Sequence, residues 1–209
     1  IGGWTGVGVG AGAYVGLRRG DSPNVSSQRR AGALAVHDEL KLARPATDAA
    51  QPAFSKLCVE TEIRHERQAI LSTRRPRAAD EPAPWMFHLL APHKSAPEEV
   101  SYETDRLRFI GRGRTTADPQ ALDDNAALSG NAGPVLDPVA AIRCRMTLEP
   151  GETTTVDLIS GISGTREACI GLVERYQDRR LADRLLAAGP KHRQAILTRL
   201  HATESDVQL

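Results

Sequence analysis

The sequence predicts a mainly β protein, an antiparallel β-sandwich that is followed by a helical segment at its C-terminal end. Short runs in which apolar and polar residues alternate recur through most of the chain. Clusters of proline, glycine, asparagine and aspartate separate these runs. After residue 164 the apolar residues take on helical spacing. We therefore expect a poorly packed segment over residues 1–30, the sandwich over 31–163 and a helical linker over 164–209.

The composition is that of a globular domain, with 209 residues of which 40% are hydrophobic and 25% charged. A net charge of +1 provides no overall attraction to nucleic acid or to an anionic membrane. No apolar run reaches the roughly 18 to 20 residues that span a bilayer. Three widely spaced cysteines do not indicate a disulfide framework. The chain begins at Ile1 without a signal-peptide pattern, so we expect a piece of a longer protein.

The first segment, IGGWTGVGVGAGAYVG, contains many glycines but does not match a dinucleotide-binding loop. Ala13 occupies the position of the third glycine, and no strand pattern precedes the loop. We expect weakly packed strands here. Residues 33–43 then fit either a strand or a short helix, because their apolar period is ambiguous.

A hairpin is predicted over residues 57–75, with the sequence RHER at its tip. Apolar and polar residues alternate from Leu57 to Ile63, which is typical of a half-buried strand. The run from Trp85 to Leu90 predicts another strand, and the prolines around it favour an edge position or a strand entry.

The clearest hairpin is predicted over residues 139–163. Ile142, Cys144 and Met146 alternate with arginines and a threonine, and Glu-Pro-Gly-Glu over 149–152 predicts the turn. The sequence SGISG at 160–164 would end the second strand. Thr165 then predicts the N-cap of a helix that Gly189 and Pro190 would end, and a second helical run follows from His192.

The stretch ETDRLRFIGRGRT, residues 103–115, is the candidate binding site. Read as a strand, it places Asp105 on the side of Leu107 and Phe109, opposite Arg106. A carboxylate and guanidinium groups can bind sugar hydroxyls or phosphate, so the candidate substrate-binding residues are Asp105, Arg106, Arg112 and Arg114. Gly111 and Gly113 would shape the following turn. Two alternatives stay open: the charged residues only brace this turn, or the arginine-glycine tract binds nucleic acid.

The sequence predicts no catalytic residue, metal site or cofactor. The six histidines do not cluster, and Cys58 and His65 lack a second ligand pair for zinc. The chain contains no G-x-S-x-G nucleophile elbow, although a Ser/His/Asp triad stays possible. Acidic residues are interleaved with the basic runs and aromatic residues are few, so we expect no nucleic-acid partner.

Several motifs, in this order, resemble one known family. The segments that carry the resemblance are DAAQPAFSKLCVETE (48–62), RRPR with EPAPW (74–85), ETDRLRFIGRGRT (103–115), LSGNAGPVLDPVAAIRCRM (128–146), PGETTTVDLISGISGTREACIGLVERYQD (150–178) and LTRLHATESDVQL (197–209). The chain is similar to the β-sandwich, or supersandwich, domain that precedes the catalytic helical barrel in glycoside hydrolase family 94. The most similar form is that of the cyclic β-1,2-glucan synthases, also classed as the glycosyltransferase 36 family.

The resemblance implies a structural, carbohydrate-associated domain rather than a catalyst. The general acid of the family lies in an (α/α)6 barrel that would begin after Leu209, so no catalytic residue transfers to this chain. The implied partners are that barrel, a second copy in a homodimer, and β-glucan or phosphate. The implied location is the cytoplasmic side of a bacterial inner-membrane-associated protein, in which another region builds β-1,2-glucan from UDP-glucose. An independent sugar- or phosphate-binding module is the alternative.

Overall fold

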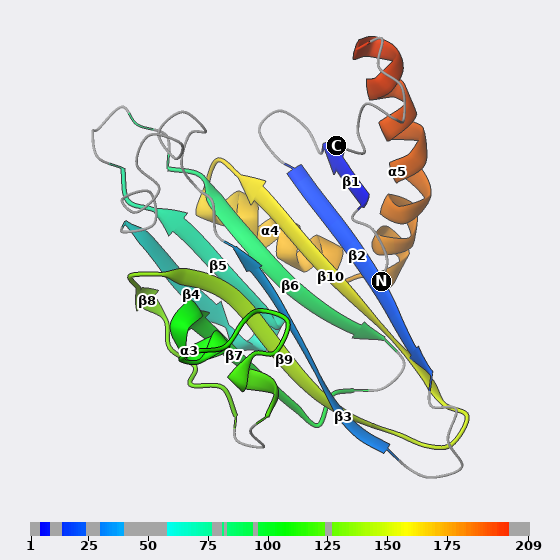
Figure 1. Ribbon diagram of the computed structural model, residues 1–209. Helices are drawn as coiled ribbons and strands as arrows, with labels where there is room; N and C mark the ends of the chain where they lie inside the picture. The colour runs from blue at the N-terminus through cyan, green and yellow to red at the C-terminus, as the bar shows by residue number, and fades with distance from the viewer. Residues whose placement is uncertain are drawn as a thin grey trace.

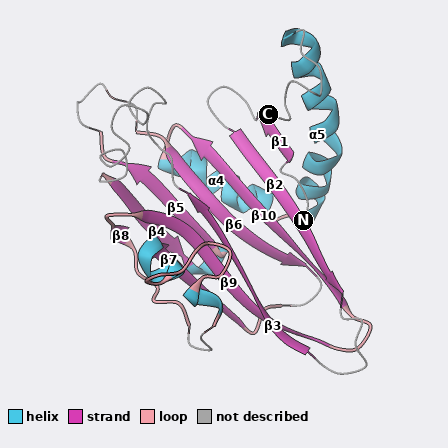
Figure 2. Cartoon of the chain, viewed as in Figure 1, coloured by secondary structure: helices cyan, strands magenta, loops and turns pink. Residues whose placement is uncertain are grey.

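The structure is a computed structural model that describes residues 5–8, 14–23, 30–39, 58–76, 81, 83–93, 96–123 and 127–200. Over residues 5–39 the description covers the backbone alone. Two antiparallel sheets face each other, and helices lie on the outside of both (Figure 1). Figure 2 shows the strands gathered in the centre of the described chain, with most of the helical residues at its C-terminal end. This confirms the prediction of a mainly β sandwich followed by helices.

The larger sheet has seven strands in the order β1-β2-β10-β6-β5-β4-β8. In that order they are β1 (Thr5–Gly8), β2 (Tyr14–Pro23), β10 (Thr153–Ser163), β6 (Trp85–His93), β5 (Ala69–Arg74), β4 (Val59–Arg64) and β8 (Gly133–Pro134). The smaller sheet consists of β3 (Arg30–Glu39), β9 (Pro138–Leu148) and β7 (Glu99–Asp105), with β9 in the middle. Of the ambiguous residues 33–43, residues 33–39 therefore belong to a strand, and residues 40–43 lie outside the described residues.

The core between the two sheets follows from the period of two along the strands. On β9, Ile142 and Cys144 are completely buried and face Ile70, Leu90 and other apolar side chains of the larger sheet. The residues between them on β9 point to the opposite, outer face of the smaller sheet. The alternation in the sequence thus predicted correctly which side of β9 faces the core.

Helix α4 (Arg166–Tyr176) covers the outer face of the larger sheet. Its buried residues Leu172 and Val173 pack on Leu71, Phe87 and Ile159, which belong to three adjacent strands. Because both faces of these strands are covered, β5 and β10 are buried almost throughout. The predicted N-cap is confirmed: the Oγ1 atom of Thr165 accepts a hydrogen bond of 3.2 Å from the Ala168 amide.

Burial also determines how reactive the Cys169 thiol is. Cys144 and Cys169 are buried, Cys58 is half-buried, and all three are free thiols, as the sequence predicted. Cys169 lies on the buried face of α4, where burial raises the pKa of its thiol to about 12. A thiol with such a pKa stays protonated at neutral pH and is a poor nucleophile.

The hairpin of β4 and β5 is confirmed, and its tip binds α4. The tip is the short 3-10 helix η1 (His65–Arg67). The Arg67 guanidinium donates to Glu174 at 2.9 Å, and the Gln177 side-chain amide donates to the Arg67 carbonyl at 2.7 Å. The RHER sequence therefore joins the hairpin to the helix.

A second contact between this hairpin and α4 depends on pH. Arg166 donates to both carboxylate oxygens of Glu62, at 2.7 and 3.0 Å, and its guanidinium lies 5.8 Å from the centre of the Trp85 ring. The hydrogen bonds from Arg166, and then those from Arg64, lower the pKa of Glu62 below its usual value of 4.5. The ionised carboxylate is therefore the form that stabilises the folded chain.

Glu62→Gln is expected to lower the free energy of unfolding by about 1 kcal/mol at neutral pH, because both partners are about one-third exposed. A carboxylate whose pKa is lower in the folded state contributes its full stability above its unfolded pKa. The difference between wild type and variant should thus be constant above about pH 5 and disappear as the pH falls through the lowered pKa. Urea unfolding followed by circular dichroism across this range measures it. A difference that persists in strong acid would contradict this assignment.

The predicted hairpin over residues 139–163 is wrong in its pairing. β9 and β10 are consecutive strands joined by the turn at Glu149–Glu152, but they belong to different sheets. β9 pairs with β3 and β7, whereas β10 pairs with β2 and β6. Each strand thus already has two neighbours, and the turn carries the chain across the sandwich.

The predicted edge position of the strand at residues 85–90 is also wrong. The alternative prediction, that a proline marks the entry to this strand, is correct. β6 lies between β10 and β5, in the interior of the sheet. Pro84 precedes the strand, and Pro92 lies beyond Leu89, where pairing with β5 ends. Neither proline therefore removes a hydrogen bond from the region in which β6 has two partners.

The predicted end of the first C-terminal helix at Gly189 is wrong as well. The helical run breaks at Gln177 and Asp178, and α5 (Arg179–Leu200) continues through Pro190. Asp178 starts this second helix, because its side chain accepts a hydrogen bond of 2.9 Å from the Arg180 amide. A proline inside a helix removes one backbone donor, and here the helix continues past it.

The expectation for residues 1–30 lies mostly outside the described residues, which there give only backbone. β2 pairs with β10 along its whole length, so residues 14–23 belong to the larger sheet. The side-chain packing of this segment stays a prediction.

Candidate functional site

The stretch 103–115 does not continue as a strand after Asp105. β7 ends there, and a short helix α3 (Arg106–Ile110) follows. The Asp105 carboxylate accepts hydrogen bonds from the amides of Leu107 (2.9 Å) and Arg108 (3.3 Å) and so caps this helix. The predicted alternation of Asp105 and Arg106 across a strand is therefore wrong, because an aspartate that can cap the next turn competes with strand extension.

The three other predicted binding residues lie on the surface around α3. The Arg106 guanidinium is 3.6 Å from the Asp137 carboxylate. Arg114 forms an ion pair with Asp123, while Arg112 is exposed. These contacts compensate the charge of Arg106 and Arg114 locally, so the tract does not present the uninterrupted positive charge that nucleic-acid binding requires.

The two predicted turn glycines have left-handed backbone angles, with φ of +87° at Gly111 and +74° at Gly113. Gly111 also touches its surroundings: a Cβ atom at this position would lie 2.5 Å from the Oε1 atom of Gln120. The glycine therefore lets the end of α3 approach the 3-10 helix η2 (Gln120–Leu122) closely.

Together α3 and η2 cover the outer face of the smaller sheet. Phe109, Ile110 and Ala121 pack on Val139 and Ala141 of β9. This apolar contact holds α3, η2 and the loop at residues 127–129 over the polar part of that face. We call these three segments the lid. The segment after Asp105 in the stretch 103–115 thus covers the outer face of the smaller sheet.

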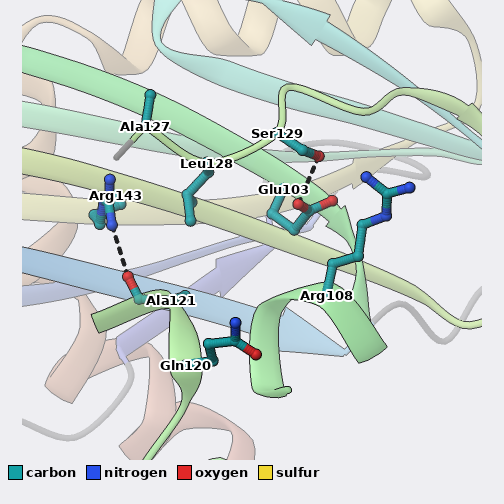
Figure 3. Close-up of a pocket in the computed structure, with 8 residues that line it drawn as sticks. All are labelled: Glu103, Arg108, Gln120, Ala121, Ala127, Leu128, Ser129 and Arg143. Carbon is teal, nitrogen blue, oxygen red and sulfur yellow. Dashed lines mark hydrogen bonds between the residues drawn. The ribbon is translucent and has the colours of Figure 1, made fainter. Parts of the chain in front are cut away.

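A cavity of about 340 Å³ lies beside this apolar contact, between the lid and the sheet (Figure 3). Its lining comes from β7, β9, both short helices and the loop before β8: Glu103, Arg108, Gln120, Ala121, Ala127, Leu128, Ser129 and Arg143. In Figure 3, Arg143 lies at one end of the group and Arg108 at the other, with Leu128 and Glu103 between them. Four of its eight described lining residues, Arg108, Gln120, Ala127 and Ser129, are exposed, so it is an open pocket whose volume lies at the lower end of the range for small-molecule sites.

Glu103 is the central polar residue of the cavity lining, and only 2% of its surface is exposed. Its Oε1 atom accepts hydrogen bonds of 3.0 Å from the amides of Thr104 and Asp105, at the point where β7 bulges away from β9. Its Oε2 atom accepts one of 2.7 Å from the Ser129 hydroxyl. Three donors thus stabilise the carboxylate, which holds the loop of Ser129 over the sheet.

Arg143 enters the cavity from β9 and is also 2% exposed. One of its guanidinium nitrogens donates a hydrogen bond of 2.7 Å to the Ala121 carbonyl, which fastens η2 to the sheet. Pairing of Ser101 with Arg143 places Glu103 and Arg143 on the same face of neighbouring strands. Strand register therefore brings together two charged residues that lie forty positions apart.

None of the four predicted substrate-binding residues, Asp105, Arg106, Arg112 and Arg114, lines this cavity. Glu103 and Arg108 come from the same stretch but were not predicted. The alternation on β9 could have indicated Arg143, since it places this side chain opposite the core. No local signal indicates Gln120 or Ser129, because they reach the cavity only through the packing of the lid.

Two histidine pairs, one buried and one partly buried, bear on the possible Ser/His/Asp triad. His88 and Ser160 are joined by a hydrogen bond of 2.8 Å, and His93 and Asp157 by one of 2.7 Å. Each pair links β6 to β10, but the two pairs share no residue, and both His88 and Ser160 are buried in the sheet. Among these four residues the arrangement does not form a triad that a substrate could reach.

In the described part of the chain, no three histidine, cysteine, aspartate or glutamate side chains gather as metal ligands. The described helices also include none that is both long and apolar enough to cross a membrane.

Comparison with known proteins agrees with the sandwich architecture. The family model of the glycosyl hydrolase 94 supersandwich domain matches residues 11–179, a range that begins upstream of the expected sandwich boundary at residue 31. The cyclic beta-(1,2)-glucan synthase NdvB of Rhizobium meliloti (strain 1021) is 30% identical over 154 residues. This match covers 74% of the chain and 5% of the synthase, so the chain corresponds to a small part of that relative. The chain therefore belongs to the family of glycosyl hydrolase 94 supersandwich domains.

Proposed function

We propose that this chain is a non-catalytic supersandwich domain of a protein that makes cyclic β-1,2-glucan. The observation that carries the proposal is the match of residues 11–179 to the supersandwich family, together with the similarity to a cyclic glucan synthase. The burial of the His88–Ser160 pair and of Cys169 adds support, because a substrate cannot reach these groups. The chemistry would then take place in another region of the same protein, on the cytoplasmic side of the membrane.

We further propose that the outside of α3 packs on that catalytic region. Leu107 is 64% exposed and Leu136 is 81% exposed. They lie on adjoining segments, because the Arg106 amide donates a hydrogen bond of 2.9 Å to the Asp137 carbonyl. Two neighbouring exposed leucines form an apolar surface that contact with another domain, or with a second copy in a homodimer, would remove from water.

The purified 209-residue chain is expected to have no glucan-forming activity. Incubation with radiolabelled UDP-glucose should produce no labelled β-1,2-glucan, and incubation of β-1,2-glucan with phosphate should release no sugar phosphate. The complete coding region is the control: it should contain a catalytic barrel and show activity in the same assays. Labelled glucan made by the chain alone would overturn the non-catalytic assignment, and a coding region without a catalytic domain would overturn the context.

A ligand contact through Asp105, Arg106, Arg112 and Arg114 stays part of this proposal, with β-glucan or phosphate as the ligand. Arg112 is the most informative member, because it is exposed and is not involved in capping α3. Calorimetry with β-1,2-glucan and with phosphate, on the wild-type chain and on Arg112→Ala, tests this contact. Binding that the substitution leaves unchanged would remove Arg112 from the site.

A further inference from the structure

The cavity on the outer face of the smaller sheet brings charged side chains together. Its described lining includes two arginines, Arg108 and Arg143, and one glutamate, Glu103. The negative charge of Glu103 is already stabilised by two backbone amides and the Ser129 hydroxyl. Arg143 is buried and donates to the Ala121 carbonyl, so Arg108 is the exposed charged group of this described lining.

Arg108 supplies a cation that can still bind a ligand. Its side chain is 62% exposed, and its ion-pair contact with the Asp105 carboxylate is a long one of 3.7 Å. The side chain extends from α3 on the same side as Glu103 and Ser129 (Figure 3). A planar guanidinium in this position matches the two oxygens of a carboxylate or a phosphate.

The other lining groups indicate the rest of the ligand. Gln120 and Ser129 present an amide and a hydroxyl, which can exchange hydrogen bonds with hydroxyl groups. Leu128 and the two alanines give an apolar wall, and the described lining residues include no aromatic ring. Neutral saccharides usually gain much of their affinity from an aromatic surface, so an anionic group would have to supply it here.

We propose that this cavity binds a small polyhydroxylated molecule that carries one anionic oxygen group, a phosphate or a carboxylate. The Arg108 guanidinium binds the anionic group at the rim, and Gln120 and Ser129 contact hydroxyls. Arg143 holds η2, the element that carries Gln120, in place through the Ala121 carbonyl. This site is independent of the proposed role in glucan synthesis and uses none of the residues Asp105, Arg106, Arg112 and Arg114.

The test is calorimetric titration of the 209-residue chain with glucose 6-phosphate, glucuronate and glucose. Arg108→Gln removes the rim cation, and Arg175→Gln removes an exposed arginine of α4 as the matched control. We expect saturable binding of at least one anion and much weaker binding of glucose. Arg108→Gln should weaken anion binding roughly tenfold, while Arg175→Gln binds like wild type.

A second measurement locates the ligand without relying on any variant. In NMR spectra of the wild-type chain, the anion should shift the side-chain amide signals of Gln120 and the Nε–H signal of Arg108. Binding of both anions supports a general oxyanion site, and binding of one identifies the phosphate or the carboxylate as its ligand. Glucose affinity equal to that of both anions, absence of saturable anion binding, or anion binding that Arg108→Gln leaves unchanged would overturn the proposal.

Discussion

Glu103→Ala is expected to lower the free energy of unfolding by about 3 kcal/mol, because it removes a buried carboxylate that accepts three hydrogen bonds, one of them fully buried. The donors are the amides of Thr104 and Asp105 and the hydroxyl of Ser129. The first two lie at the bulge of β7, where pairing with β9 is interrupted, so the carboxylate replaces part of the missing sheet hydrogen bonding. Urea unfolding monitored by circular dichroism measures the loss.

Two further variants separate this role from a general effect of removing a glutamate. Glu99 lies on the same strand, but it is about one-third exposed and 3.5 Å from Arg145, so Glu99→Ala should cost less than about 1 kcal/mol. Glu103→Gln keeps one oxygen for the two amides and should lose only about half as much as Glu103→Ala. Equal destabilisation by Glu99→Ala and Glu103→Ala would contradict the role given to Glu103.

Phe87→Ala is expected to destabilise the chain by about 3 to 5 kcal/mol. Phe87 is completely buried on β6, between β5 and β10, and belongs to the core under α4. Removing the ring leaves a cavity beneath α4, and the surrounding strands, already paired on both sides, cannot collapse to fill it. The expected result is a lower urea midpoint with an unchanged slope.

An exposed leucine provides the control for Phe87. Leu107→Ala removes an apolar side chain that is 64% exposed and should change the free energy of unfolding by less than about 0.5 kcal/mol. Removing contacts under α4 should also make the amides of that helix exchange faster with solvent than in wild type. A loss below about 1 kcal/mol for Phe87→Ala would show that α4 is not packed as described.

Local patterns in the sequence predicted the elements whose causes are local. Thr165 caps α4 because its hydroxyl reaches an amide three residues away, and the alternation on β9 is a direct result of strand geometry. The hairpin of β4 and β5 also followed from short-range signals. In each case the residues that decide the structure lie within about one turn or one strand of each other.

The errors occurred where two local solutions compete. After Asp105, an apolar alternation that fits a strand competes with an aspartate that can cap a helix, and the helix wins because Phe109 and Ile110 can then pack on β9. The turn at Glu149–Glu152 has the sequence of a hairpin turn, yet β9 and β10 separate because each obtains two partners in a different sheet. Neither outcome can be read from the residues of the turn itself.

The candidate site, too, was predicted from the sequence only in part. The sequence singled out the stretch 103–115 and, through resemblance, the family, but it selected four charged residues of which none lines the cavity. Glu103 and Arg143 meet because β7 and β9 pair in one particular register, and Gln120 and Ser129 arrive with the lid. These side chains come from four separate segments that meet only in the folded chain. The spacing of residues along the sequence therefore does not predict that they share a site.

By itself the sequence therefore determined the mainly β class, the order of strands before helices, the inner face of β9 and the start of α4. These depend on alternation, turn residues and capping, all of which act over a few neighbouring residues. Only the tertiary structure decided which strands share a sheet, where the helical run breaks, and which charged residues meet beneath α3. The reason is that strand pairing and lid packing are contacts between distant segments, chosen by the surface that the whole chain buries.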